Sequence, residues 1–292
     1  MNGLLRAELF KLGTTSARWL FGLAILASTV VYLVVNAVTA HSLLLPFDQY
    51  VSVASHGHAD TIPPEFLAHI RSEWDLGHSA VTQAATLYTS GQLVNVLLVC
   101  LLGVVLVTSE YYQQTATTTF LITPRRSRVV LAKLATAVLL AGLAWLVATV
   151  LSLGVGSLFL HHEGLGSQLS QPGVLRAVGL NLAAYVIWAV FGVGVGALVR
   201  HQLAATVGTT VLYLAGTGAA GLFELLREYV IHHDWILTAQ VVLPPIASAV
   251  MISPTKTFDQ SPGQWVGAAV LVAYGLVMGA IGITTLRRRD VT

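Results

Sequence analysis

The chain has 292 residues, of which 55% are hydrophobic and only 10% are charged. This balance excludes a typical soluble domain, whose surface carries far more charge. The formal net charge is +2, and the single cysteine, Cys100, lies inside an apolar run, which excludes a disulfide framework and a thiolate metal site. We therefore expect one all-α integral membrane domain over residues 1–292.

Six apolar runs are long enough to cross a membrane, because a spanning helix needs about 20 mostly apolar residues. They lie at about 19–40, 91–108, 131–160, 175–199, 202–223 and 265–286. Basic residues precede the first run, as in a secretory signal, but its apolar core exceeds the roughly 7–15 residues of such a signal. We expect a retained first helix, led by an interfacial helix at 2–16 in which Leu5, Leu9 and Leu12 share one face.

The basic residues predict the orientation of these spans. With a cytoplasmic N-terminus, 11 of the 15 basic residues fall on the cytoplasmic side, while ten of the 13 acidic residues and nine of the ten histidines fall outside. This satisfies the positive-inside rule with both termini in the cytoplasm. The further apolar segment 235–252 is interrupted by Gln240 and Pro244-Pro245, so we expect a re-entrant or outer-interface element there.

Two other segments suggest local structure. Residues 41–90 are predicted to form a long outer loop, within which Phe66, Ile70 and Trp74 favour a short amphipathic helix; an ordered, solvated loop is the alternative. The stretch GVGVGA at 192–197 formally fits a dinucleotide fingerprint. Because it lies inside an apolar span with no strand before it, we interpret its glycines as close helix packing.

Several chemistries are disfavoured by the residues present. No catalytic motif occurs, and the spans hold no central Asp, Glu, Lys or Arg for ion coupling. The strongest polar groups there are Asn36, Asn95 and Asn181, which either line a pathway or act as interhelical hydrogen bonders. The outer histidines are expected to be solvated, and no metal is predicted; a site built from His56, His58, His161 or His162 is the weak alternative.

No phosphate-binding loop is present, since the dipeptide Gly-Lys does not occur. We expect this chain to carry no cofactor and no ATPase activity of its own. Any ATP and Mg²⁺ would be bound by a separate subunit on the cytoplasmic face, where the largest feature between spans is 109–128, SEYYQQTATTTFLITPRRSR.

The sequence also resembles a known family. Glu110-Tyr111 followed by TATTTFLITPRRSRVVLAKLA at 115–135 is similar to the coupling-helix segment of type-2 ABC exporter permeases, and the match extends in order to LLRAELFKLGTTSARW near the start, VVLPPIASAV at 241–250 and LRRRDV at 286–291. Gln113-Gln114 and the long outer loop depart from the family pattern. The resemblance implies a permease subunit that pairs with a second permease chain, while two ATP-binding subunits dock below and push on the coupling helix.

The residues that we expect to couple this chain to an ATPase subunit are Glu110, Tyr111, Thr115, Thr117, Thr118, Thr119, Phe120, Leu121, Pro124, Arg125 and Arg126. Glu110 closes the second span on the cytoplasmic side, at a depth similar to that of Arg18, Arg128 and Lys133. We hypothesise that it forms an ion pair with one of them, a solvated carboxylate being the alternative.

These inferences predict the transmembrane subunit of an ATP-driven exporter in the cytoplasmic membrane. Its substrate is expected to be a hydrophobic or amphipathic drug, lipid or peptide, and nucleic acid is not expected as a partner because no basic patch lies in a soluble module. The first alternative is a membrane binding or immunity protein on the same fold, and the second is an intramembrane enzyme.

Overall fold

A computed structural model of the chain describes residues 6–8, 10–11, 16–55, 63–113, 126–199, 201–231, 233, 235–258 and 260–288. Within these ranges the regular structure is entirely helical. Six helices are long and apolar enough to span a membrane, so the chain is a multi-pass membrane protein. They are α2 (Ala17–Leu44), the continuous pair α5 (Ala80–Tyr88) and α6 (Gln92–Tyr112), α8 (Arg126–His162), α9 (Pro172–Leu198), α10 (Gln202–Leu226) and α13 (Gln264–Arg288).

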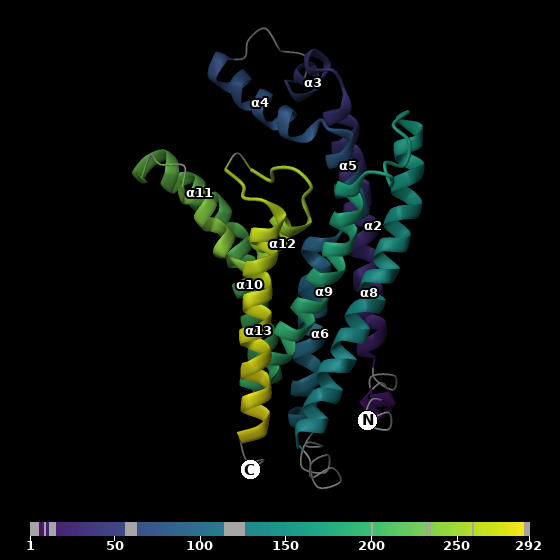
Figure 1. Cartoon of the computed structure of the whole chain (residues 1–292), viewed down its shortest axis with the longest axis vertical. Coiled ribbons are helices and arrows are strands. Elements are labelled where there is room, and N and C mark those ends of the chain that lie inside the picture. Colours follow the sequence, from purple (N-terminus) through teal and green to yellow (C-terminus); the bar gives the residue numbers. More distant parts are fainter. Residues whose placement is uncertain are drawn as a thin grey trace.

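The six helices form one elongated bundle with two different ends (Figure 1). Helix α2 begins and α13 ends at the same end, which we call the terminal end; α6 also ends there and α8 begins there. At the opposite end, the loop end, the short helices α3 (Phe47–Ala54) and α4 (Pro64–Gly77) extend beyond the bundle. An even number of crossings explains why α2 and α13 share one end.

Glycine residues bring the central helices into backbone contact. A Cβ atom at Gly103 of α6 would lie 2.6 Å from the Ala189 carbonyl oxygen of α9, and one at Gly196 would lie 2.8 Å from the Val104 oxygen. A Cβ at Gly192 would overlap the Cys100 carbonyl. The packing interpretation of GVGVGA is therefore confirmed, and the three glycines form what we call the α6–α9 seam.

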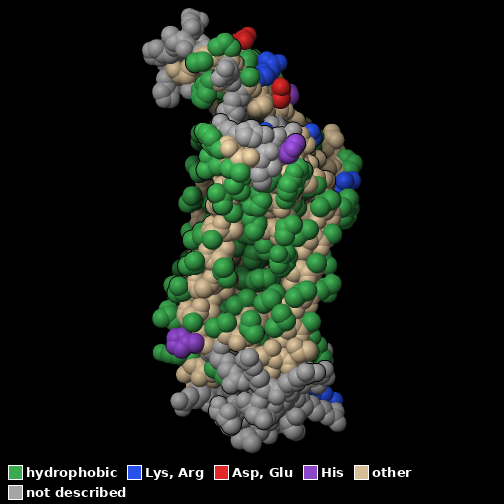
Figure 2. Space-filling model, turned by 90° about the vertical axis from the view of Figure 1, so that its left-hand side faces the viewer, with side chains coloured by type: hydrophobic (Ala, Val, Ile, Leu, Met, Phe, Trp, Pro, Cys, Tyr) green, Lys and Arg blue, Asp and Glu red, His purple; other side chains and the backbone are tan. Residues whose placement is uncertain are grey.

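The outer helices leave most of their surface uncovered. In the most apolar window of the span, 61% of residues are buried for α5–α6 but only 17% for α2 and 17% for α10. Leu23 of α2 and Leu212 of α10 are 61% and 74% exposed. Figure 2 shows the corresponding belt of hydrophobic side chains on one face, with acidic and basic side chains gathered near the loop end. Such a belt matches a lipid environment.

The second span begins earlier than predicted. It starts at Ala80 rather than at 91, so the expected outer loop 41–90 is too long by the whole of α5. The segment was mistaken for a loop because Thr82, Gln83 and Thr86 lower its hydropathy. In the structure Gln83 is buried and donates to the Gly77 carbonyl at 2.6 Å, while the Thr86 hydroxyl donates to its own helix at 3.0 Å.

The interrupted segment 235–252 folds into a broken element, and its re-entrant or outer-interface position stays a prediction. Helix α11 (Trp235–Ala239) continues into the 3₁₀ turn η3 (Gln240–Val242), and α12 (Pro244–Ile252) leaves at an angle of 103°. Prolines at the start of α12 account for the break, because they fit the first helical turn but cannot continue a preceding helix. The pair would count as a seventh span only if its two arms were one crossing.

The two predicted amphipathic helices are described to different extents. The helix expected around Phe66–Trp74 is present as α4, where Ile70 is buried and the Trp74 indole donates to the Leu45 carbonyl at 3.0 Å. Of the expected helix at 2–16, residues 6–8 and 10–11 are helical, and the others except residue 16 lie outside the described residues.

Candidate functional site

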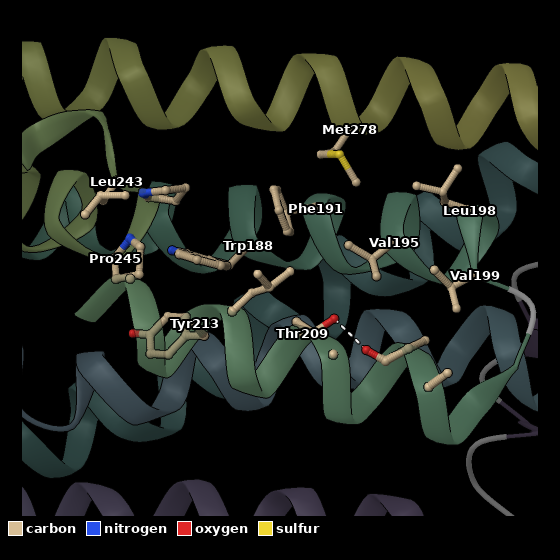
Figure 3. Close-up of a pocket in the computed structure, with 16 residues that line it drawn as sticks. Trp188, Phe191, Val195, Leu198, Val199, Thr209, Tyr213, Leu243, Pro245 and Met278 are labelled. Atoms are coloured by element: carbon tan, nitrogen blue, oxygen red, sulfur yellow. Dashed lines mark hydrogen bonds between the residues drawn. The ribbon is translucent and has the colours of Figure 1, made fainter. Parts of the chain in front are cut away.

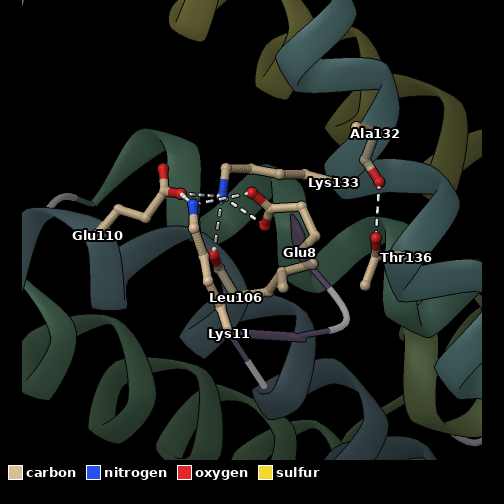
Figure 4. A network of polar contacts seen from close by, with 7 residues as sticks. All are labelled: Glu8, Lys11, Leu106, Glu110, Ala132, Lys133 and Thr136. Atoms are coloured by element: carbon tan, nitrogen blue, oxygen red, sulfur yellow. Dashed lines mark hydrogen bonds and ion pairs between the residues drawn. The ribbon is translucent and has the colours of Figure 1, made fainter. Parts of the chain in front are cut away.

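Four charged side chains meet at the terminal end of the bundle and are referred to here as the charge cluster (Figure 4). They are Glu8 and Lys11 from the N-terminal helical residues, Glu110 from the last turn of α6, and Lys133 from the second turn of α8. Glu8 and Glu110 are each 5% exposed and Lys133 only 2%. Two acids and two bases leave the cluster with no formal net charge, which makes its burial possible.

Lys133 is the centre of the cluster. Its ammonium group lies 3.0 Å from Glu8 Oε2, 3.0 Å from Glu110 Oε1 and 3.3 Å from the Leu106 carbonyl oxygen. A lysine has three N–H donors, and three oxygen atoms surround this one. A lone buried ammonium would be costly, so the position of Lys133 depends on both carboxylates being present.

Lys11 closes the cluster from the solvent side. Its ammonium donates to Glu110 Oε1 at 2.6 Å and to Glu8 Oε1 at 3.2 Å. Burial acts to lower the pKa of Lys11, but the bonds to the Glu110 and Glu8 carboxylates outweigh it and raise the pKa above the ordinary value. Lys11 therefore stays charged at neutral pH and joins the N-terminal residues to α6.

The position of Glu110 is electrostatically unfavourable without these partners. It lies in the last turn of α6, where the helix dipole carries partial negative charge and disfavours a carboxylate. Lys11 and Lys133 supply the opposing charge directly. The cluster therefore connects three separate segments through one carboxylate.

The structure brings Glu110 together with one of its three predicted partners. Lys133 forms the ion pair, whereas Arg18 and Arg128 form none with Glu110 and are exposed. The prediction missed Glu8 and Lys11. Two signals were available: Glu8 and Lys11 are three residues apart, and Glu8 is the one acidic residue among basic ones near the start of the chain. Neither signal shows which helices these side chains contact.

Most of the predicted coupling residues lie outside the described part of the chain. Glu110 and Tyr111 belong to the last turn of α6, and Arg126 is the first residue of α8, although its side chain is not described. The undescribed members are Thr115, Thr117, Thr118, Thr119, Phe120, Leu121, Pro124 and Arg125. The segment that contains them joins the helix of Glu110 to the helix of Lys133.

The predicted asparagines have two kinds of environment. Asn36 donates to the Ser90 hydroxyl at 2.9 Å, and Asn95 donates to the Thr29 hydroxyl at 2.9 Å. Both therefore connect α2 to the second span, which is the interhelical role left open by the sequence. Asn181 of α9 is 3% exposed, and its Oδ1 atom has no hydrogen-bond partner among the described residues.

A cavity of about 440 Å³, not predicted from the sequence, lies between α9, α10, α12 and α13 (Figure 3). Trp188, Phe191 and Tyr213 form its aromatic wall, with Trp188 5.2 Å from Tyr213 and 5.5 Å from Phe191 between ring centroids. The Tyr213 hydroxyl donates to the Leu93 carbonyl at 2.5 Å and the Trp188 indole to the Ser248 hydroxyl at 3.4 Å. Among the described residues that line the cavity none is charged, so it fits an uncharged apolar or aromatic group.

The charge cluster and the cavity are suited to different kinds of interaction. The cluster holds its groups as mutually neutralised buried ions that are costly to separate, which suits a mechanical connection between the three segments. The cavity offers ring faces and aliphatic walls, which suit binding by apolar contact.

Comparison with known proteins places the chain in no family: no protein-family model matches it, and no curated protein matches it in sequence.

Proposed function

We propose that this chain is the permease subunit of an ATP-driven exporter of the ABC class, and that it receives force from a separate ATP-binding subunit. The observation that carries the proposal is the buried charge cluster, in which Glu110, Lys133 and Lys11 join α6, α8 and the N-terminal residues. This arrangement supports a coupling role because the segment 114–125 connects α6 directly to α8.

The physical basis of coupling follows from burial. A displacement of segment 114–125 would act on the last turn of α6 and the first turns of α8 together. Because Lys133 and Glu110 are buried, separating them would be costly unless Glu8 and Lys11 moved with them. The cluster would therefore transmit a push from outside the bundle to several helices at once instead of bending one helix.

The cavity supports the expected substrate class. Its volume of about 440 Å³ and its uncharged aromatic lining suit a hydrophobic molecule or the apolar part of an amphipathic one. In this proposal the chain works in the cytoplasmic membrane with both termini in the cytoplasm and pairs with a second permease chain. Two ATP-binding subunits supply ATP and Mg²⁺, and this chain is not catalytic by itself.

The test is reconstitution of the chain in lipid vesicles with an ATP-binding subunit that co-purifies with it, with ATP hydrolysis and uptake of a hydrophobic dye into inverted vesicles measured together. The variant is Glu110→Gln, which keeps the shape and removes the charge. We expect ATP hydrolysis to persist, while the amount of dye transported per ATP hydrolysed falls by between about 5-fold and about 150-fold. This range corresponds to typical coupling free energies between two sites.

Arg128→Gln is the matched control, since Arg128 is exposed near the same end of α8 and forms no ion pair with Glu110. Equal transport by wild type and Glu110→Gln would contradict the coupling role of the cluster. Failure of any ATPase to co-purify with the chain would contradict the proposed function itself and favour a membrane binding protein.

A further inference from the structure

A second concavity lies on the membrane-facing side of α2, well separated in sequence from the aromatic cavity. It has a volume of about 460 Å³ and is open along one side where α2, α6 and α8 meet. It is lined by α2 between Arg18 and Leu26, by Leu102 of α6 and by α8 around Leu143. We call it the α2 groove.

The length of the α2 groove matches one leaflet of a bilayer. From Arg18 to Leu26 the helix rises by about 12 Å, at about 1.5 Å per residue. Half of a hydrocarbon core of about 30 Å is close to this distance. Leu23 is 61% exposed and Leu143 57%, so the groove opens toward the surrounding lipid and not into the protein core.

The two ends of the α2 groove differ in chemistry. Apart from Arg18 the described residues of its lining are uncharged, and Arg18 lies at the terminal end. The Arg18 guanidinium stacks over the Trp19 ring, with Cζ 5.4 Å from the ring centroid, and Trp19 is 65% exposed. Tryptophan is enriched at the level of lipid headgroups, and stacked arginine presents a planar set of donors that suits phosphate.

Arg18 has no carboxylate counterpart in the described ranges of the chain, and the only interaction found for it there is the ring contact with Trp19. With a positive group at one end and an apolar lining along its length, the α2 groove is complementary to a molecule with a negative head and a long apolar tail. A neutral apolar molecule would leave the guanidinium without a partner. A zwitterionic lipid would place its own cation near Arg18.

We propose that the α2 groove binds one anionic phospholipid, with its phosphate on Arg18 and one acyl chain along α2 between Gly22 and Leu26. The site is independent of the proposed export function. The lipid would cover a helix of which only 17% of the apolar window is buried by protein. It would therefore hold α2 against α6 and α8, the two helices that carry Glu110 and Lys133.

The experiment is native mass spectrometry of the full chain released from mixed vesicles of phosphatidylglycerol and phosphatidylcholine in equal amounts. Wild type is expected to retain one phosphatidylglycerol in preference to phosphatidylcholine. Arg18→Gln should lower this preference roughly fivefold, the size expected for one basic residue at an anionic surface, whereas Arg18→Lys should keep most of it. Arg128→Gln is the charge-matched control at the same end of the bundle and should change nothing.

Gly22→Leu tests the apolar part of the site. A Cβ at Gly22 meets no atom within 4 Å, so a leucine would fill the groove without disturbing the fold and should abolish retention of the lipid. Gly208→Leu is the matched control, because Gly208 lines the aromatic cavity and is equally open. Equal retention of the two lipids by wild type, an equal effect of Arg18→Gln and Arg128→Gln, or undiminished binding by Gly22→Leu would each overturn the proposal.

Discussion

Helix α6 packs against α9 at glycine residues, where the backbones of the two helices meet. It contacts α8 and the N-terminal residues through charged side chains. Along the seam, Gly103 and Gly192 leave no space even for a methyl group. At the terminal end, the ammonium groups of Lys11 and Lys133 hold the Glu110 carboxylate at 2.6 and 3.0 Å. Close backbone packing resists small displacements, while buried ion pairs hold segments together as long as both charges are present.

This difference assigns separate tasks to the two contacts. We infer that α6 and α9 move as one body and that the charge cluster joins this body to α8 and the N-terminal residues. The following predictions test each contact in turn.

The largest effect is expected for Gly192→Leu, which breaks the seam. The new Cβ would overlap the Cys100 carbonyl, and backbone atoms of two helices cannot move aside as a flexible side chain can. Overpacking usually costs about 1–3 kcal/mol. Here we expect the free energy of unfolding to fall by about 5 kcal/mol or more. Losses of this size are exceptional and have a specific structural cause, in this case overpacking of the seam.

The measurement is the yield of monodisperse protein in mild detergent, followed by chemical unfolding of whatever folds. Gly208→Leu in α10 is the control and should unfold like wild type, because its Cβ meets no atom within 4 Å. If both variants behave alike, the seam is no tighter than the outer helices and the comparison fails.

The next largest effect is expected for Lys133→Met, which breaks the charge cluster. The variant keeps the apolar length of the side chain but leaves Glu8 and Glu110 with Lys11 as their remaining cation in the cluster. Removing one partner of a buried ion pair typically costs about 3–5 kcal/mol, and we expect a loss in this range. Chemical unfolding in detergent micelles measures it.

Adding Glu110→Gln to Lys133→Met should restore part of the lost stability, since Lys11 then balances the one carboxylate that remains, Glu8. Arg128→Gln should change stability by less than about 0.5 kcal/mol because Arg128 is exposed. Strictly additive losses in the double variant would show that Lys133 and Glu110 do not act on each other.

The sequence predicted features that depend on local pattern. Each spanning helix is visible as an apolar run of sufficient length, and GVGVGA was interpreted as a packing motif because it lay inside such a run. The break at Pro244 was predictable for the same reason, since proline acts on its own helix. Where polar side chains are buried, as at Gln83, hydropathy placed the helix start too late.

Features that depend on the lateral arrangement of helices were not predictable. Arg18 and Lys133 lay at similar depths in the sequence, and only the packing of α2 shows that Arg18 faces lipid while Lys133 faces Glu110. Glu8 reaches Lys133 and Lys11 reaches Glu110 because the N-terminal residues lie against α6 and α8, which no periodicity reveals. The aromatic cavity likewise requires four helices to be placed first.

The smallest effect is expected for Asn181→Leu, which tests a contact that is neither seam nor ion pair. Asn181 is 3% exposed, yet its Oδ1 atom has no partner among the described residues, so little hydrogen-bond energy is lost on replacement. Burying a leucine there should leave stability unchanged within about 0.5 kcal/mol or raise it, because an unsatisfied buried acceptor is removed.

Asn36→Leu is the control, since Asn36 donates to Ser90 at 2.9 Å and an interhelical hydrogen bond of this kind is worth about 0.6 kcal/mol in a membrane. A larger loss for Asn181→Leu than for Asn36→Leu would mean that buried water or another polar partner occupies the space beside Asn181. In that case α9 would hold a polar connection at Asn181 in addition to its close backbone packing against α6.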